Sequence, residues 1–459
     1  MARSETSHPP AVERLLAAGR PRLAVEHDHD ALGAAAQAVI AGERRRLGAG
    51  ASGRDLGGLA DELLAALDDL ADPRRSGLVG VINATGVILH TNLGRAAWPA
   101  VAIEAAAAAA SGYSLLELDR ATGRRGARFR TAEEHLIALT GAEDALVANN
   151  NAAALALAVG LAGRGRGVAV ARGELVEIGG GVRIPEIVRR SGARLVEVGT
   201  TNRTRIADFD EVLADGRAHL VLRVHPSNFV ISGFTESPDP ASVAAAAHRH
   251  GAIVVDDLGS GALLPTERFG LAHEPMPVER LAAGADLVTF SGDKLVGGPQ
   301  AGLIVGRADL VARLRHDPLA RATRPDKTTM AAVGATLGLY RAGLAATEIP
   351  IWRLIGATAE AIRVRAAAIV AGLSAGITGV SVEPVESTIG GGSLPGETLP
   401  SFGLVIRAGA VSRRLDALRR SDPCVVARVA GGALILDLRT VDPADDTSLG
   451  RALATLLGA

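Results

Sequence analysis

The sequence predicts an α/β protein with a mostly parallel central sheet, a small helical domain before it and a smaller α+β domain after it. Three observations support this prediction. Apolar residues follow helical spacing up to about residue 75, strand-length apolar runs alternate with helical patterns from about Gly80, and the pattern changes again near residue 345. A chain of 459 residues is long enough to bury two or three separate cores.

The first domain is predicted over residues 1–75. Apolar residues recur every three or four positions within Ala11–Gly19, His29–Leu47 and Asp55–Leu70, as on the buried face of a helix. Glycine and proline interrupt the pattern at Pro21, Gly48–Gly53 and Pro73. We therefore expect a bundle of short helices that ends near Arg75.

The second domain, residues 76–345, is predicted to contain the sheet. Near-continuous runs of Val, Leu and Ile between helical patterns are typical of parallel strands that are covered on both faces. Helical patterns follow the first two of these strands at Ala152–Leu161 and Ile184–Arg190. The expected strands are Asp144–Ala148, Gly167–Ala171, Arg194–Val198, His219–Val224, Ala252–Asp256, Asp286–Phe290 and Ala301–Val305.

The third domain, residues 346–459, begins with a long helical pattern over Ile351–Leu373 and ends with another over Ser448–Leu457. Between them lie four strand-like runs, which are Val380–Val382, Phe402–Ile406, Val425–Val429 and Ala433–Leu438. This mixture predicts an α+β domain.

The composition excludes several classes of protein. The start has no basic segment followed by an apolar one, and no apolar stretch approaches the roughly 20 residues that span a bilayer. The single cysteine, Cys424, excludes an internal disulfide and a cysteine-based metal cluster. We expect a cytoplasmic protein with no membrane or DNA partner. The net charge of −1 neither predicts nor excludes an RNA partner.

Lysine is scarce, because 49 Lys and Arg residues include only two lysines, Lys294 and Lys327. Arginine cannot lose its proton and attack a carbonyl, so a retained lysine is a candidate for that chemistry. Ser291, Asp293 and Lys294 follow a predicted strand, and a glycine loop follows them. The alternative is that Lys294 is an ordinary lysine in a surface loop. An acyl-serine enzyme is disfavoured, because the Ser-Asp-Asn and Lys-Thr-Gly motifs that accompany its Ser-x-x-Lys pair are absent.

Other polar residues at strand ends suggest pyridoxal phosphate (PLP) bound to Lys294 as a Schiff base. PLP needs a carboxylate beside its pyridine nitrogen, and Asp256 or Asp257 fits; we prefer Asp256, the first carboxylate after the strand, although either could be a turn residue. Asn150, Asn151 and Ala152 open a helix whose free N–H groups suit a phosphate.

Asn228, after another strand, could reach the 3′ oxygen of the cofactor, and Ser291 its phosphate. This order of phosphate loop, Asn, Asp and Lys is that of fold-type-I PLP enzymes.

Two groups of arginines suggest a second anion. Arg95 ends a glycine-punctuated segment, and Arg321 and Arg324 lie three residues apart, on one face of a helical turn. Arginines near a PLP pocket suggest an oxyanion other than the cofactor's own phosphate. Salt bridges to surface carboxylates would explain the spacing of these arginines equally well.

Long contiguous segments resemble the bacterial selenocysteine synthases, the L-seryl-tRNA(Sec) selenium transferases. The segments are Asn83–Arg95, Arg172–Gly180, Asp256–Gly261, Ser291–Gly302 and Gly390–Pro395, and the resemblance runs over essentially the whole chain. No motif position departs from the family pattern.

The resemblance implies a PLP-dependent conversion of L-seryl-tRNA(Sec) to L-selenocysteinyl-tRNA(Sec), by β-elimination of water and addition of selenium from selenophosphate. It implies PLP on Lys294, an active-site Asp293, and selenophosphate bound by Arg95, Arg321 and Arg324. It also implies a tRNA-binding N-terminal domain and a homo-oligomer built as a ring of dimers. The N-terminal domain is not basic overall, so its RNA contacts would come from clusters such as Arg20/Arg22 and Arg44–Arg46.

Two other functions remain open from the sequence. Related PLP ammonia-lyases act on phosphorylated amino-sugar acids and share the Ser291–Lys294 region, but they would not need a tRNA-binding domain. A PLP-free RNA-binding or scaffold protein descended from the enzyme is the other alternative, and an intact Lys294 and Asp256 argue against it.

Overall fold

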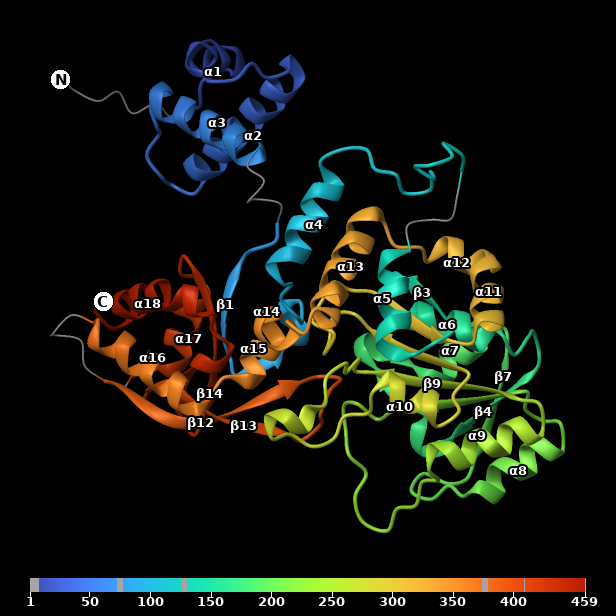
Figure 1. Cartoon of the computed structure of the whole chain (residues 1–459). Coiled ribbons are helices and arrows are strands. Elements are labelled where there is room, and N and C mark those ends of the chain that lie inside the picture. The colour runs from blue at the N-terminus through green and yellow to red at the C-terminus, as the bar shows by residue number, and fades with distance from the viewer. Residues whose placement is uncertain (1–7, 72–76, 126–129, 374–378, 408, 459) are drawn as a thin grey trace, which may run out of the picture. The chain divides into compact units, whose positions relative to one another are not determined.

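The computed structural model describes residues 8–71, 77–125, 130–373, 379–407 and 409–458. The chain divides into two compact units, Met1–Gly80 and Val81–Ala459, which are coloured from blue to red in Figure 1. The predicted boundary near Arg75 lies outside the described residues.

The N-terminal unit is a small helical bundle, as its apolar spacing predicts. It contains α1 (Val12–Gly19), η1 (Arg20–Arg22), α2 (His29–Gly48) and α3 (Leu56–Ala71). Asp28 begins α2, because its side chain accepts a hydrogen bond of 2.9 Å from the backbone N–H of Asp30. The three helices enclose one apolar core that includes Leu15, Ile40 and Leu63.

The larger unit contains a seven-stranded sheet in the order β3-β11-β10-β9-β8-β4-β7. Only β11 is antiparallel to its neighbours, and the other pairings are parallel. All seven predicted strands are therefore present in a parallel-dominated sheet. The strands are β3 (Asp144–Ala148), β4 (Gly167–Ala171), β7 (Arg194–Val198), β8 (Leu220–Val224), β9 (Ile253–Gly259), β10 (Leu287–Ser291) and β11 (Gly302–Gly306).

Helices cover both faces of this sheet (Figure 1). Leu146 and Val170 belong to the core beneath α6, α7 and α11, while their chain neighbours Val147 and Ala171 belong to cores on the opposite face. Successive side chains of a strand point to opposite faces, so both faces are apolar. The helices of this part are α4 (Ala100–Ala110), α5 (Thr131–Thr140), α6 (Asn151–Gly160), α7 (Ile184–Arg190), α8 (Ile206–Ala214), α9 (Pro240–Arg249), α10 (Pro277–Ala282), α11 (Ala308–His316), α12 (Pro318–Ala322) and α13 (Lys327–Arg341).

A second sheet of six strands has the order β1-β14-β15-β13-β12-β2. It comprises β1 (Val81–Ala84), β2 (Val87–Leu89), β12 (Val380–Gly390), β13 (Thr398–Ile406), β14 (Cys424–Ala430) and β15 (Ala433–Asp437). The expected C-terminal strands are present, but β1 and β2 come from a segment that the sequence assigned to the sheet-containing domain. Val81 pairs with Cys424 and Leu89 with Gly390, so this part of the fold depends on contacts that are distant in sequence.

The helix expected over Ile351–Leu373 is two helices, α15 (Pro350–Gly356) and α16 (Ala359–Ala371). Thr358 separates them, because its hydroxyl accepts a hydrogen bond from Ala361 N–H and begins α16. The remaining elements are α14 (Ala345–Glu348), α17 (Val411–Arg419), α18 (Asp446–Gly458), η3 (Thr91–Leu93), η4 (Arg172–Glu174), β5 (Glu177–Ile178), η5 (Gly179–Gly181), β6 (Val182–Arg183), η6 (Thr266–Phe269), η7 (Leu438–Thr440) and η8 (Pro443–Asp445). Among the described residues, no helix is long and apolar enough to cross a membrane.

Candidate active site

A cavity of about 320 Å³ gathers most of the predicted site residues. It lies where β8, β9 and β10 end and α6 begins, which is where parallel α/β sheets commonly bind ligands. Its lining includes Arg95, Asn150, Asn151, Ala152, Asn228, Ser291, Asp293 and Lys294. The structure thus brings together predicted site residues that are up to 199 positions apart (95 to 294) in the sequence.

Lys294 lies in the turn that follows β10, and its amine is enclosed by glycines. A Cβ atom at Gly392 would collide with Nζ, and one at Gly259 would lie 3.5 Å from it. Burial lowers the pKa of Lys294, and the Arg95 guanidinium lowers it further, against the opposing effects of Asp257 and Asp293. A lowered pKa favours the neutral amine that attacks a carbonyl.

Asp257 is the carboxylate of β9 that faces this cavity. Its Oδ1 accepts hydrogen bonds of 2.8 Å from Asn151 Nδ2 and 2.9 Å from Thr289 Oγ1. Burial raises the pKa of Asp257, although both hydrogen bonds lower it. Both bonds end on Oδ1, so among the described residues Oδ2 stays available to a donor in the cavity.

Our preference for Asp256 is corrected by this arrangement. We expected the strand to end at Asp256, but β9 continues to Gly259, so Asp256 and Asp257 point to opposite faces. Asp256 lines a second cavity of about 510 Å³ instead, where its Oδ2 lies 3.7 Å from Arg280 Nε. Burial raises the pKa of Asp256, and Arg280 opposes that effect.

The start of α6 has the form of an anion site. Asn150 is its N-cap, with its side-chain oxygen 2.9 Å from the backbone N of Ala153. Asn150, Asn151 and Ala152 line the cavity, and the start of a helix is a place that suits a phosphate. Gly302 is required beside this loop, because a Cβ atom there would collide with the backbone of Asn150.

Arg95 and Asp293 form an ion pair at the edge of the cavity. Arg95 Nη1 donates a hydrogen bond of 2.8 Å to Asp293 Oδ2. The backbone of Arg95 is left-handed, with φ of 65°, and Gly94 before it has φ of 90°. Such a conformation is uncommon outside glycine, and functional sites are where it is often found.

Ser291 and Asn228 also line the cavity, with different surroundings. Ser291 ends β10 and is buried, with its side chain among the cavity walls. Asn228 is exposed, and its Nδ2 donates to the backbone oxygen of Glu177 at 3.3 Å. Ser227, which precedes it, lines the cavity as well and lies near Gly259.

Arg321 and Arg324 do not line the Lys294 cavity of the described chain. They lie in a separate cavity of about 460 Å³, and Arg324 Nη1 donates to Glu117 Oε1 at 3.0 Å. The segment that contains them is tied to the loop before α6, because Asn149 N–H donates to Thr323 O at 2.8 Å. The segment thus lies beside the loop before α6, but its two arginines line a different cavity from that of Lys294.

Three further residues at the site were not predicted from the sequence. Thr289 pairs with Asp257 across β10 and β9, so the strand register could have suggested it. His225 directly follows β8, and it lines both the Lys294 cavity and the second cavity. Glu274 lies in a loop with no motif, and nothing in the local sequence marks it.

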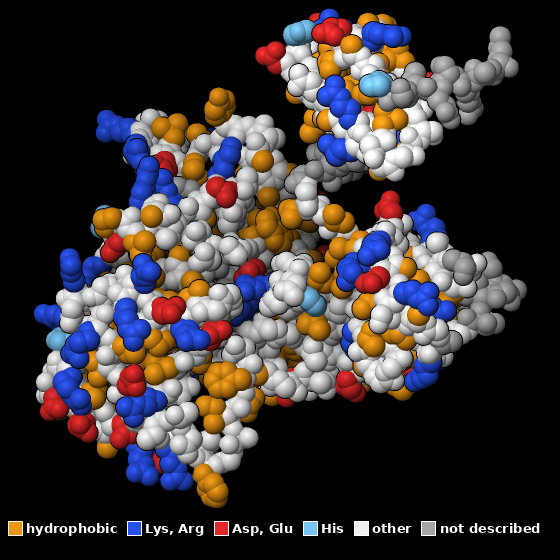
Figure 2. All heavy atoms as spheres, turned by 180° about the vertical axis from the view of Figure 1, so that it is seen from behind, with side chains coloured by type: hydrophobic (Ala, Val, Ile, Leu, Met, Phe, Trp, Pro, Cys, Tyr) orange, Lys and Arg blue, Asp and Glu red, His pale blue; other side chains and the backbone are white. Residues whose placement is uncertain are grey.

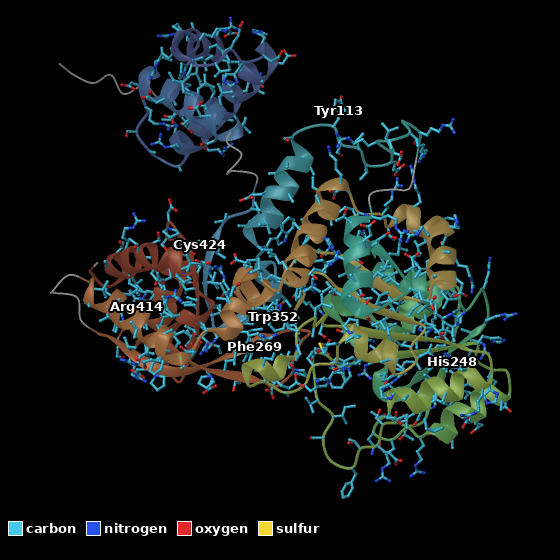
Figure 3. The ribbon with its side chains drawn as sticks, viewed as in Figure 1. Tyr113, His248, Phe269, Trp352, Arg414 and Cys424 are labelled. Carbon is cyan, nitrogen blue, oxygen red and sulfur yellow. The ribbon has the colours of Figure 1, made fainter. Side chains whose placement is uncertain are left out.

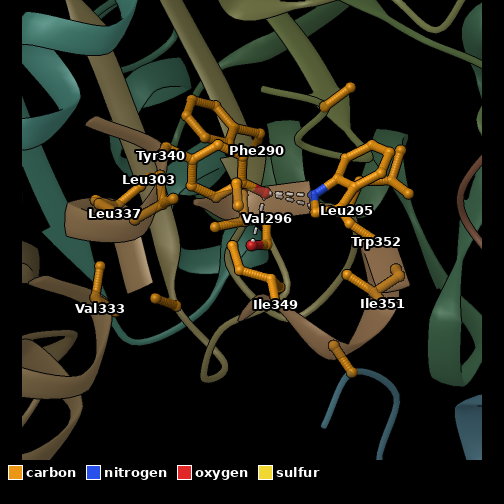
Figure 4. Close-up of a cluster of buried hydrophobic side chains, with 14 of the residues drawn as sticks. Phe290, Leu295, Val296, Leu303, Val333, Leu337, Tyr340, Ile349, Ile351 and Trp352 are labelled. Atoms are coloured by element: carbon orange, nitrogen blue, oxygen red, sulfur yellow. Dashed lines mark hydrogen bonds between the residues drawn. The ribbon is translucent and has the colours of Figure 1, made fainter. Parts of the chain in front are cut away.

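A buried hydrogen-bond network holds the turn after Lys294 (Figure 4). Tyr340 Oη lies 3.0 Å from Leu295 O and 2.9 Å from Val296 O, and it accepts a hydrogen bond of 2.6 Å from Trp352 Nε1. Trp352 also stacks on Phe269, with ring centroids 5.2 Å apart (Figure 3). The position of the lysine thus depends on packing between α13, α15 and the central sheet.

Comparisons with known proteins agree with the resemblance seen in the sequence. A family model described as SelA, L-seryl-tRNA selenium transferase, matches residues 81–442. The L-seryl-tRNA(Sec) selenium transferase of Moorella thermoacetica is 48% identical over 389 residues, which are 83% of each chain. That of Rhizobium meliloti is 44% identical over 441 residues, covering 94% of this chain and 93% of the relative.

Among solved structures, a D-glucosaminate-6-phosphate ammonia-lyase matches with a TM-score of 0.60 and 22% identity, over 84% of this chain and 97% of that one. At that identity the likeness concerns the fold, and it confirms the predicted fold-type-I architecture. The family of this chain is shown by the family model together with the relatives that are 44–48% identical to it. The chain belongs to the L-seryl-tRNA selenium transferase family.

Proposed function

We propose that this enzyme converts L-seryl-tRNA(Sec) to L-selenocysteinyl-tRNA(Sec), with selenophosphate as the selenium donor and PLP on Lys294. The observation that supports this most directly is the convergence of Lys294, Asp257 and the start of α6 in one cavity, in a chain of this family. A buried lysine, a buried carboxylate and free helix N–H groups are the three anchors that PLP needs.

The residues present fit PLP. Lys294 would hold the cofactor aldehyde, and the first turn of α6 together with Ser291 would hold the phosphate. Asp257 Oδ2 would accept a hydrogen bond from the pyridine nitrogen, while Asn151 and Thr289 occupy its other oxygen. When bound, PLP withdraws electrons from the Cα atom of the substrate.

The chain's own residues then account for proton transfer and donor binding. Lys294, released from the cofactor, is the base for the α-proton of the seryl group, and its lowered pKa suits it to that step. Arg95 presents a guanidinium at the mouth of the cavity, where a selenophosphate anion can bind. Asp293 orients that guanidinium through their 2.8 Å hydrogen bond.

We also propose Arg321 and Arg324 as selenophosphate ligands, on the condition that they act in the cavity of another subunit. They do not face the Lys294 cavity of the described chain, so in this proposal they serve the cavity of a neighbouring copy. Apolar side chains are exposed on and after α4, and they include Ile103, Leu115 and Tyr113, of which Tyr113 is labelled in Figure 3. Such exposure is consistent with the homo-oligomer that this arrangement requires.

We further propose that the N-terminal unit binds the tRNA, in the cytoplasm. On the face in Figure 2, its basic side chains are interspersed with acidic and apolar ones. Arg22 is paired with Asp61 and Arg46 with Glu43, whereas Arg44 and Arg45 are exposed on α2. This pair is therefore the best placed for contacts to RNA phosphates.

The deciding experiment is an assay of the purified full-length protein with seryl-tRNA(Sec) and selenophosphate. Selenocysteinyl-tRNA should form, and borohydride reduction should attach PLP to the peptide that contains Lys294. Release of ammonia from a phosphorylated amino-sugar acid, without selenium transfer, would favour the ammonia-lyase alternative. A label on Lys327, the other lysine of the chain, would refute the assignment of Lys294.

A further inference from the structure

Glu274 connects three parts of the site, although it lies on a loop between η6 and α10. Its side chain is 2% exposed, and its Oε2 accepts a hydrogen bond of 3.3 Å from Leu394 N–H. Its own backbone N–H donates to Thr266 Oγ1 at 3.0 Å, which anchors the loop that contains it. The carboxylate is therefore held in place from its own side and reaches across to residues of the C-terminal region.

The partner of Glu274, Leu394, belongs to the glycine loop, which we define as residues 390–396. Leu394 is buried and left-handed, with φ of 48°, a conformation that costs free energy for a residue other than glycine. Two residues earlier, Gly392 lies so close to Lys294 that a Cβ atom would collide with Nζ. The hydrogen bond from Leu394 to Glu274 thus holds a strained segment directly over the lysine.

The other carboxylate oxygen of Glu274 faces the histidine that separates the two cavities. Glu274 Oε1 lies 3.2 Å from His225 Nε2. His225 lines the Lys294 cavity on one side and the second cavity on the other, and its backbone N–H donates to Asp257 O at 2.9 Å. Neither Glu274 Oε1 nor His225 Nε2, both of them buried, has a hydrogen-bond partner among the described residues, so Glu274 acts on the ring through its charge rather than through a hydrogen bond.

We propose that Glu274 is a positioning residue, which holds the glycine loop over Lys294 and places a negative charge beside the His225 ring in the wall of the cofactor cavity. The proposal rests on the proposed function in one respect, since Lys294 is taken as the PLP lysine. A carboxylate differs here from a neutral acceptor, because its negative charge also acts on the lysine. The Glu274 charge raises the pKa of Lys294, against the lowering by burial.

Three variants of the full-length protein test this proposal. Glu274→Gln keeps an oxygen for Leu394 N–H but removes the charge, and Glu274→Ala removes both. Glu397→Gln is the matched control, because Glu397 lines the same second cavity and accepts a hydrogen bond of 3.0 Å from Ala272 N–H. Glu397 is not among the main charges acting on Lys294, which are Asp257, Arg95, Asp293 and Glu274.

The first measurement is the pH dependence of the visible absorbance of PLP on Lys294. A nearby negative charge stabilises the protonated lysine linkage, so its loss should move the midpoint to lower pH by roughly half a unit in both Glu274 variants. Glu397→Gln should leave the midpoint unchanged. An unchanged midpoint in Glu274→Gln, or an equal shift in Glu397→Gln, would overturn the proposal.

The second measurement is amide hydrogen exchange of the peptide that spans the glycine loop. Exchange should be about fivefold faster in Glu274→Ala, as the loss of one hydrogen bond predicts, and close to wild type in Glu274→Gln. Equal exchange in all variants would overturn the proposed hold on the loop. Neither measurement uses tRNA or selenophosphate, and exchange does not need PLP, so a failure of the proposed function would be recognised separately by the absence of selenocysteine.

Discussion

The Tyr340–Trp352 network offers the sharpest test of how the fold positions Lys294. Changing Tyr340 to Phe keeps the ring in the core but removes its hydroxyl. Trp352 Nε1 then loses its acceptor, 2.6 Å away, and Leu295 and Val296 lose a donor. Because the phenol shares one proton between two carbonyls, one hydrogen bond is lost on that side and one buried donor is left unpaired on the other.

These two losses set the magnitude. A hydrogen bond contributes about 1 kcal/mol and an unpaired buried donor costs about 1–3 kcal/mol, so the free energy of unfolding should fall by roughly 2–3 kcal/mol. No cavity term is added, because phenylalanine fills the same ring space. Burial raises the pKa of Tyr340, so the phenol stays neutral and the effect should not vary between pH 6 and pH 9.

Urea titration of the larger unit is the assay, and the chain provides its own control. The only other tyrosine, Tyr113, is fully exposed and stands away from the core in Figure 3. Tyr113→Phe should therefore change the free energy of unfolding by less than about 0.5 kcal/mol. A similarly small change for Tyr340→Phe would refute the network, and so would full additivity of Tyr340→Phe with Trp352→Phe in a double-mutant cycle.

Further predictions concern the site and its pH dependence. Asp257→Asn should slow removal of the α-proton far more than Asp256→Asn, measured as α-deuterium exchange of bound seryl-tRNA; the reverse order would restore Asp256 as the pyridine partner. An inactive Arg321→Ala protein mixed with an inactive Lys294→Ala protein should regain selenocysteine formation in hybrid oligomers, because each copy then supplies what the other lacks. A mixture no more active than its components would place Arg321 outside a neighbour's site. Burial raises the pKa of Glu174 to about 7, so its ionisation destabilises the folded state. Relative to Glu174→Gln, wild-type stability should therefore fall as pH rises from about 4.5 through 7, and parallel stability curves would contradict this.

Much of the local structure follows from sequence patterns alone. The seven strands of the central sheet were predicted within a few residues, because runs of Val, Leu and Ile that are buried on both faces differ clearly from the helical spacing around them. Lys294 was indicated as the candidate cofactor lysine by chemistry rather than by pattern, since an arginine cannot replace a reactive amine.

Only the tertiary structure shows which way a side chain points and which residues that are distant in sequence come into contact. The two aspartates of β9 are neighbours in sequence and point to opposite faces of the sheet, and only the packing around the sheet determines that Asp257 lines the Lys294 cavity. The segment that contains Arg321 and Arg324 is tied to the loop before α6 through the backbone of Thr323, yet both arginines line another cavity. Glu274 has no motif around it, and it reaches the site because Leu394, 120 residues later, donates to its carboxylate. Local patterns report which residues are buried, because burial repeats with the period of a helix or strand; which buried side chains meet depends on how the elements pack.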